Sequence, residues 1–222
     1  KYVFNMVHLQ PILDKLLASY KILRIEDKLS FDYDNRYFDT EDFLFYYQHH
    51  NESRNRYKIR FRNYSSTNKT FFEIKTKNNK NRTIKKRLIN NNNNVFFNEA
   101  ERQLIENIIG ISPDKLKPSI NIKFNRITLV DNLFKERLTF DTNLIVKDGL
   151  NTKKFEKLVI AEIKQHKYNP KSSFIKILQN MKIPEMKFSK YCMGMIHLKT
   201  DLKQNRFKPK LYLINKILSE NN

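Results

Sequence analysis

The stretch "NRYKIRFRNY", residues 55–64, alternates charged and apolar side chains with unusual regularity. Lys58, Arg60 and Arg62 fall on one parity, whereas Ile59 and Phe61 fall on the other. Side chains two residues apart share a face of a β-strand. The stretch therefore predicts a strand with one apolar face and one face that carries cations.

Four further stretches repeat this design. They are "FFEIKTK" at 71–77, "TIKKRL" at 83–88, "KERLTFD" at 135–141 and "VIAEIK" at 159–164. Each predicts a strand with one charged and one apolar face, with Lys86 as an exception. Over the five strands, nine cations and three acids occupy that face: Lys58, Arg60, Arg62, Lys75, Lys77, Lys85, Arg87, Arg137 and Lys164 against Glu73, Asp141 and Glu162.

Such an excess of cations indicates an anionic partner. The whole chain has 43 Lys and Arg against 23 Asp and Glu, a formal charge of +20. Like charges opposite one another on neighbouring strands are destabilising unless an anion compensates them. The plainer alternative is an antiparallel sheet with a solvated outer face.

Several classes of anion site are absent. The chain has only 3 Gly, and neither GxxxxGK[ST] nor GxGxxG occurs, so a glycine-rich phosphate loop is excluded. No helix-turn-helix, zinc-finger or aromatic RNP pattern favours nucleic acid. No stretch approaches 18 uninterrupted apolar residues, the length typical of a membrane span.

The remaining pattern predicts an α+β chain that forms a single domain over 1–222. We expect amphipathic helices at 9–20, from a cap at Asn98 to a stop at Gly110, at 172–181 and at 211–219. Closing the sheet would turn the charged faces inward, because eight strands make a barrel just wide enough for one slender ligand. The predicted fold is an eight-stranded antiparallel β-tunnel, a closed barrel with flanking helices. Its strands are expected at 33–39, 55–64, 70–77, 82–89, 120–130, 135–146, 156–165 and 190–199.

A series of motifs resembles one known family in order and over nearly the whole chain. They are "KY" at 1–2, "YFDT" at 37–40, "KIRFRNY" at 58–64, "FFEIKTK" at 71–77, "KKR" at 85–87, "NR" at 125–126, "RLTFD" at 137–141, "AEIK" at 161–164 and "FSKYCMGM" at 188–195. Together they resemble the catalytic domain of the VTC (vacuolar transporter chaperone) family of polyphosphate polymerases. That family belongs to the CYTH-like triphosphate tunnel metalloenzymes. One departure is Phe124, where the family often has tyrosine.

The resemblance implies a set of site residues. The residues expected at the reacting phosphates are Arg60, Arg62, Lys75, Arg137 and Lys190. Further substrate contacts are expected from Lys1, Arg126 and Ser189, with Lys85 and Arg87 as additional candidates, and the charged-face pattern adds Lys58, Lys77 and Lys164. Glu162 resembles the metal-ligating glutamate, helped by Glu73, for Mn²⁺ or Mg²⁺.

The implied activity is transfer of the γ-phosphate of ATP to a growing inorganic polyphosphate chain, in the cytoplasm or at the inner face of a membrane. The expected partners are ATP, polyphosphate or triphosphate, with no nucleic acid and with a membrane partner protein as an option. Two alternatives remain: an inorganic or organic triphosphatase on the same fold, and a non-catalytic polyphosphate-binding subunit. The acid-poor charged face argues against a hydrolase that must activate water.

Three other features have mainly structural interpretations. His49 and His50 are expected as an exposed pair at a hairpin rather than a metal site, because no matching Cys or His spacing accompanies them. Cys192 is expected to be a small buried hydrophobe. The stretch "NRFKPK" at 205–210 predicts a solvated linker, with a basic patch for lipid or polyphosphate as the alternative.

Overall fold

The computed structural model describes residues 1–80, 82–90 and 96–219, and over these residues the chain is α+β, with one antiparallel sheet of ten strands. The strands are β1 (Tyr2–Asn5), β2 (Tyr20–Ile22), β3 (Ser30–Thr40), β4 (Arg56–Tyr64), β5 (Lys69–Lys77), β6 (Thr83–Asn90), β7 (Leu116–Asp131), β8 (Glu136–Lys147), β9 (Thr152–Phe155) and β10 (Leu158–Gln165). The α-helices are α1 (Leu9–Leu16), α2 (Leu44–His50), α3 (Glu99–Ile109), α4 (Ser173–Asn180), α5 (Lys190–Leu198) and α6 (Lys208–Ser219). Short 3₁₀ turns are η1 (Met6–His8), η2 (Pro113–Lys115) and η3 (Asn205–Phe207).

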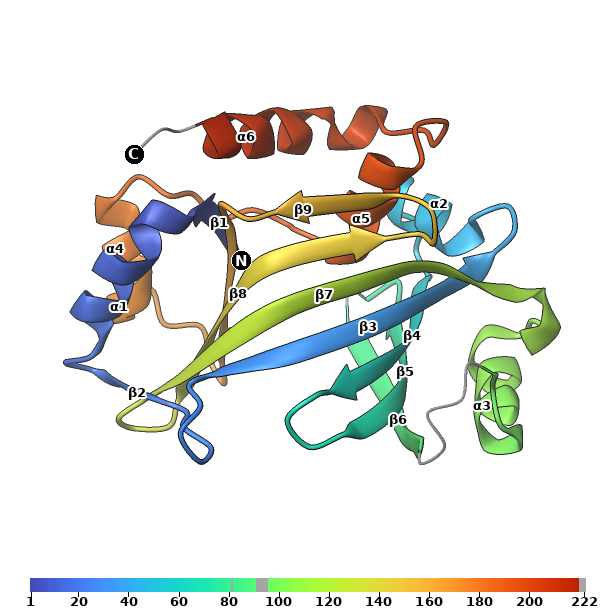
Figure 1. Cartoon of the computed structure of the whole chain (residues 1–222), viewed down its shortest axis with the longest axis horizontal. Helices are drawn as coiled ribbons and strands as arrows, with labels where there is room; N and C mark the ends of the chain where they lie inside the picture. The colour runs from blue at the N-terminus through green and yellow to red at the C-terminus, as the bar shows by residue number, and fades with distance from the viewer. Residues whose placement is uncertain (81, 91–95, 220–222) are drawn as a thin grey trace.

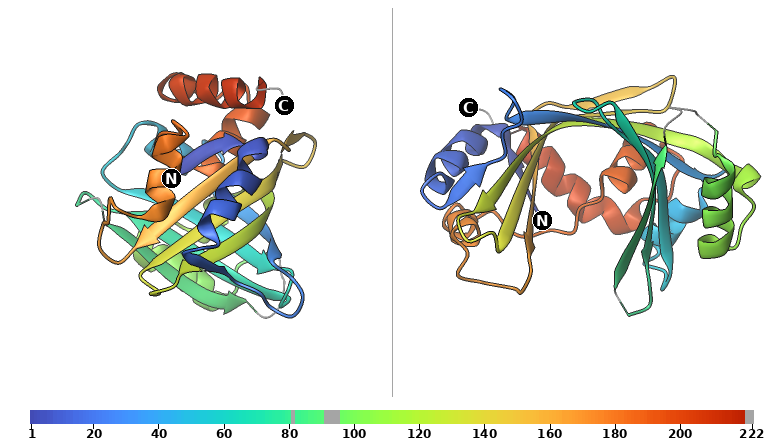
Figure 2. Two further views of the ribbon diagram at one scale, coloured as in Figure 1. Left: turned by 90° about the vertical axis from the view of Figure 1, so that its left-hand side faces the viewer. Right: turned by 90° about the horizontal axis from the view of Figure 1, so that it is seen from below.

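The sheet is an arch with two arms. Its strand order is β1-β10-β8-β7-β3-β4-β5-β6, while β2 pairs with β7 and β9 pairs with β8 (Figure 1). Seen end-on, the long strands near the middle of this order form the crest, and β4–β6 descend opposite β8 and β10 (Figure 2). Strands β5 and β6, and strands β7 and β8, are consecutive in the chain and pair antiparallel.

The expected closed barrel is not confirmed, because over the described residues no backbone pairing joins the edge strand β6 to the edge strand β1. One expected wall strand, 190–199, is instead helix α5. The run "KYCMGMIHL" is almost continuously apolar, and such a run does not distinguish a buried helix from a buried strand. Ser189 caps the helix, since its Oγ accepts a hydrogen bond from the Cys192 amide at 3.3 Å.

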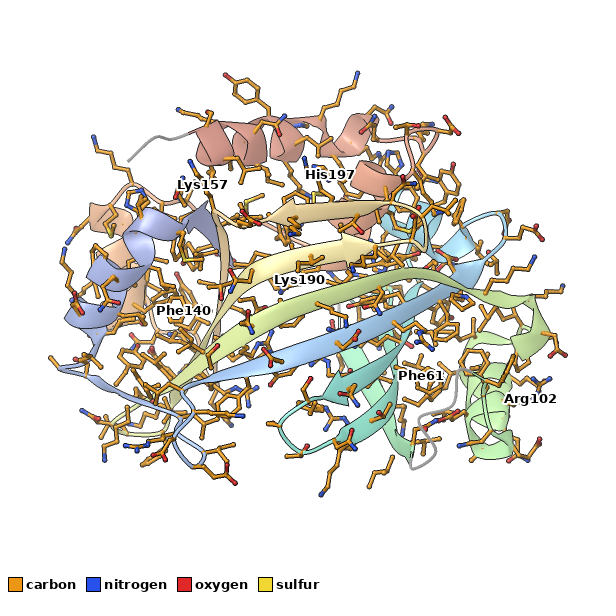
Figure 3. All side chains as sticks on the ribbon, viewed as in Figure 1. Phe61, Arg102, Phe140, Lys157, Lys190 and His197 are labelled. Carbon is orange, nitrogen blue, oxygen red and sulfur yellow. The ribbon has the colours of Figure 1, made fainter. Side chains whose placement is uncertain are left out.

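Helices α1, α3 and α4 cover the outer surfaces of the two arms, as the period-2 pattern requires for the apolar faces of the strands. Helices α1 and α4 pack over β8 and β10 with a cluster that includes Phe140. Helix α3 and Phe45 of α2 pack over β4 and β5 with a cluster that includes Phe61 and Ile105. Figure 3 labels Phe140 and Phe61 on the two sides of the molecule.

The predicted helices are present with altered limits. The capping box of Asn98 with Glu101 and the end at Gly110, whose φ is +76°, are confirmed. Helix α1 is shorter than the predicted 9–20, because Tyr20 begins β2. The side chain of Tyr20 packs in the same cluster as the buried residues of α1, but from this strand. None of the described helices is long and apolar enough to cross a membrane.

Helix α5 lies on the concave side of the arch, and Gly194 sets how closely it approaches the sheet. A Cβ at this position would stand 2.8 Å from Ile120 Cδ1 and 3.1 Å from Val146 Cγ1. Because α5 begins at Lys190, this close approach also fixes how far the helix start reaches toward the interior of the arch.

Gly194→Ala tests this packing. Overpacking costs about 1–3 kcal/mol, while replacing Gly inside a helix returns about 1 kcal/mol. We expect the free energy of unfolding, measured by urea denaturation, to fall by up to about 2 kcal/mol. Ile120→Val removes the nearest methyl group, so in the double variant the cost of the alanine should largely disappear. Stabilisation by the single Gly194→Ala change would show that the contact is not tight.

Candidate functional site

The arch encloses a cavity of about 490 Å³ that both arms and the start of α5 line. Eleven Lys and Arg side chains face it, together with one carboxylate, that of Glu162. The structure therefore brings together most of the predicted site residues: Lys1, Lys58, Arg60, Arg62, Lys75, Lys85, Arg87, Arg126, Arg137, Glu162, Lys164, Ser189 and Lys190.

A buried glutamate organises the cations of the β4–β6 arm. Glu73 is fully buried, and its Oε2 accepts hydrogen bonds from Arg60 Nε at 2.9 Å and Nη2 at 2.6 Å. Its Oε1 is 2.5 Å from Lys85 Nζ and 2.7 Å from Arg87 Nη2. Burial raises the pKa of Glu73, but the neighbouring arginines outweigh it and hold that pKa well below its usual range. Glu73 is thus an ionised counter-ion behind the cavity wall.

A buried aspartate does the same on the other side of the cavity. Asp141 accepts two hydrogen bonds from Arg126, at 2.5 and 2.7 Å, and a third from Lys190. Burial opposes ionisation, yet Lys190 and Arg126 lower the pKa of Asp141 to about 2. Burial lowers the pKa of Lys190 to about 8 despite this partner. Asp141 therefore joins a cation from β7 to one from α5, and Figure 3 labels Lys190 near the middle of the molecule.

Glu162 on β10 differs from these two carboxylates because it faces the cavity. Its oxygens lie 3.3 Å from Lys1 Nζ and 3.6 Å from Lys164 Nζ, looser than the 2.7–2.9 Å of strong charge-assisted bonds. Burial raises its pKa, but Lys1 and Lys164 lower it to about 2. Glu162 is therefore ionised at neutral pH and accessible.

One row of three lysines crosses the β4–β6 arm, and its central member, Lys75, has no ion pair among the described residues. Lys75 lies directly opposite Lys58 on β4 and Lys85 on β6. Burial, with Arg60 and Arg62 nearby, lowers the pKa of Lys75 to about 6. Like charges at paired positions destabilise a sheet, so this row favours an anion in the cavity.

Uncharged side chains of β3 hold the arginines, and the sequence analysis did not identify them. Tyr37 accepts a hydrogen bond from Arg60 Nη1 at 2.8 Å, and Asn35 accepts one from Arg62 Nε at 2.8 Å. The ring of Tyr33 lies 5.3 Å from the Arg62 guanidinium and 4.9 Å from that of Arg126, and it stacks on Phe124. Tyr33, Asn35 and Tyr37 share one parity in the strand predicted at 33–39, and this shared face was the sequence signal that could have identified them.

Three predicted positions differ in the structure. Lys77 lies outside this cavity and lines a second one. His49 and His50 lie on α2 rather than at an exposed hairpin, and His50 is almost fully buried. Residues 205–210 form η3 and the start of α6, so they are not a solvated linker. Cys192 is buried, as expected.

The described residues contain no group of three or more His, Cys, Asp or Glu side chains that could hold a metal ion by themselves. The donors that fit a hard divalent cation are the two oxygens of Glu162, completed by oxygens of a phosphate ligand. Glu73 is fully buried behind the cavity wall and its oxygens contact cations at 2.5–2.7 Å, closer than those of Glu162, so Glu73 does not fit this role.

Asp141→Asn should reduce stability and its acid dependence. A carboxylate whose pKa is depressed in the folded state stabilises the fold above its unfolded pKa, about 3.9, and this stabilisation is lost as pH falls toward about 2. We expect a loss of about 2–5 kcal/mol at pH 7 and a shallower decrease between pH 4 and 2. Urea denaturation across this range checks it, with the exposed Asp201→Asn as control; equal effects of the two variants would contradict the assignment.

Comparisons with known proteins identify a family for this chain and solved structures of similar fold. The profile of the VTC domain family matches residues 1–199, whereas no curated protein sequence matches the chain. Solved structures of similar fold include a candidate adenylate cyclase of Bacillus halodurans, with 14% identity, a TM-score of 0.53 and coverage of 83% of this chain and 90% of that one. A candidate adenylyl cyclase of Hippeastrum with a dominant triphosphatase activity has 13% identity, a TM-score of 0.52 and coverage of 87% and 93%.

A protein of Pyrococcus horikoshii has 14% identity, a TM-score of 0.50 and coverage of 91% and 98%. At such identities these likenesses establish a shared fold and nothing further. The family follows from the match over residues 1–199: this chain belongs to the VTC domain family.

Proposed function

We propose that the protein is a metal-dependent phosphotransferase that moves the γ-phosphate of ATP onto an inorganic polyphosphate chain inside the cavity. The observation that carries the proposal is the lining itself, with eleven cations and a single carboxylate. A linear phosphate chain has the charge to compensate such a surface and is slender enough to lie along it.

The cavity offers what phosphoryl transfer asks of a protein, which is mainly positioning and charge neutralisation. Arg60, Arg62 and Arg126 each have part of the guanidinium engaged by the protein, and all three face the cavity. Arginines held in this way present their remaining N–H groups to phosphate oxygens in a fixed orientation. Lys190 adds a point charge from the start of α5, and Lys75 on β5 adds another once a bound anion favours its protonated form.

The attacking group needs no base from the protein. The nucleophile is a terminal phosphate oxygen of the acceptor chain, which is already anionic. This oxygen forms a bond to the γ-phosphorus of ATP as the bond to the β-phosphate oxygen breaks and ADP leaves. Among the described residues that line the cavity there is no histidine, which agrees with a reaction in which no proton has to be removed.

Glu162 would hold the Mn²⁺ or Mg²⁺ ion, because it is the accessible ionised carboxylate of the lining. When bound, the ion supplies further neutralisation of phosphate charge. The protein's own cations hold the phosphate chain independently of that carboxylate. Binding and turnover should therefore respond differently to loss of Glu162.

A triphosphatase on the same fold is the second candidate, favoured by the fold that the chain shares with the Hippeastrum protein. A hydrolase has to orient and activate water, and the part of the lining that the structure describes holds only one carboxylate for that purpose. A polyphosphate-binding subunit without turnover is the third candidate. The products formed from ATP separate all three.

Incubation with ATP and Mn²⁺ should yield ADP and a polyphosphate ladder on a gel. Glu162→Gln should lower the rate by about 100-fold, the scale of losing one electrostatic contact to the reacting group, while tripolyphosphate binding persists. Lys154→Gln, on the exposed face of β9, is the control. Release of free phosphate without polyphosphate would instead indicate a triphosphatase, and absence of any product a binding subunit.

Tripolyphosphate should stabilise the fold, because a bound anion relieves the repulsion in the cavity. A ligand at 100 times its Kd adds about 2.7 kcal/mol, which for a chain of this size corresponds to a rise in Tm of about 5–10 °C. Arg137→Ala with Lys164→Ala, paired neighbours on β8 and β10, should reduce the shift.

The matched control is Lys208→Ala with Lys216→Ala, which removes the same charge from the exposed face of α6. Thermal denaturation at low and high salt gives the readout. A Tm that does not respond to tripolyphosphate at low salt would contradict an anion site in the arch.

A further inference from the structure

A second cavity, of about 420 Å³, adjoins the first. Lys1, Lys58, Phe188 and Ser189 line both cavities. At this junction Lys58 Nζ donates a hydrogen bond to Ser189 Oγ at 3.0 Å, and Lys1 Nζ donates one to the carbonyl of Phe188 at 3.2 Å. The two cavities are therefore neighbours that share a wall of cations rather than two separate depressions.

The second cavity is also cationic. Beyond the shared lysines it is lined by Arg56, Lys77, Lys187, Arg206 and Lys210. Within the described parts of the chain, none of these five makes an ion pair with a carboxylate. The lining contains two acids, Glu52 and Glu185, and neither forms an ion pair with these five cations over the described residues.

The cations form a continuous row along the strands. On β4, Arg56 lines the second cavity, Lys58 lines both, and Arg60 and Arg62 line the first. At about 3.4 Å per residue this single face of one strand carries positive charge over about 20 Å. On β5, Lys77 and Lys75 repeat the same division. A row of this kind suits one extended polyanion better than two separate small anions.

The far wall of the second cavity comes from α2, η3 and α6. Arg206 is oriented by a 3.0 Å hydrogen bond from its Nη1 to the carbonyl of Asn51, and Lys210 Nζ lies 5.2 Å from the ring of the buried Phe207. Burial, with Lys58 and Arg56 nearby, lowers the pKa of His49 to about 2, so this residue adds no charge. Arg206 and Lys210 lie beyond the family match at residues 1–199.

We propose that the second cavity binds the continuation of the phosphate chain beyond the Lys58–Ser189 junction, with Arg206 and Lys210 as its contacts on the far wall. The inference rests on the proposed polyphosphate ligand but not on turnover. It implies that the protein senses chain length: a short phosphate fills the first cavity alone, whereas a longer chain also engages the second and binds more tightly.

Equilibrium binding of a ladder of linear polyphosphates of defined length, measured by calorimetry without ATP or metal, tests this. In the wild type, affinity should rise in a step once the chain is long enough to pass the junction. Arg206→Gln with Lys210→Gln should remove the step and lower the affinity for long chains by about tenfold, the change produced by about 1.4 kcal/mol. The affinity of this double variant for tripolyphosphate should equal that of the wild type.

The matched control is Lys208→Gln with Lys216→Gln, which changes the net charge equally but alters residues that line neither cavity. Equal losses in the two double variants would overturn the proposal in favour of general electrostatic attraction, as would wild-type affinity that does not depend on chain length. A polyglutamate peptide that binds as tightly as long polyphosphate, with the same dependence on Arg206 and Lys210, would overturn the phosphate assignment. A protein that shows the length step but forms no polyphosphate from ATP would retain this inference and lose the proposed activity.

Discussion

Repulsion between like charges is the constraint on which this structure depends, because eleven cations of the described residues line one cavity. On each side of the cavity, one buried carboxylate compensates part of this repulsion. Glu73 contacts three cations of the β4–β6 arm, and Asp141 contacts two on the opposite side. A buried ion is costly unless it is paired and hydrogen-bonded, and both carboxylates are fully engaged. Lys75 remains without such a partner among the described residues, and burial, with Arg60 and Arg62 nearby, lowers its pKa.

The same contacts also orient the cations before any ligand arrives. Arg60 and Arg62 are held by Tyr37 and Asn35 of β3, and the ring of Tyr33 supports Arg62 and Arg126 from neighbouring strands. Side chains that are already fixed lose little rotamer freedom on binding, which favours affinity. The β3 strand is therefore more than the crest of the arch, since its uncharged side chains align charges from both sides.

Alternation was sufficient to predict β4, β5, β6, β8 and β10 and the face on which their cations lie, because a half-buried strand leaves a period of two in the sequence. It failed where that period is absent. The stretch 191–196 is buried throughout and contains no charged residue, so the pattern did not distinguish a helix from a strand there, and the predicted closed barrel was not confirmed. The roles of Tyr37 and Asn35 could not be predicted from the alternation of charged residues, because both side chains are uncharged. Their shared parity nevertheless places them on one face of the strand. Lys77 shares the parity of Lys75 on β5, but it lines the second cavity rather than the first. The alternation does not show this boundary between the cavities, which depends on where α5 begins.

In a closed barrel the number and stagger of the strands fix the diameter through a ring of backbone hydrogen bonds. The arch has no such ring over the described residues, and its interior is bounded at one end by the side chains of α5, including Tyr191. The calibre of the lumen is accordingly a property of side-chain volume. Single substitutions on the concave face can widen or narrow it while every strand pairing is retained. The width of ligand that the lumen accepts can therefore change by substitution without loss of the backbone pairing that stabilises the sheet.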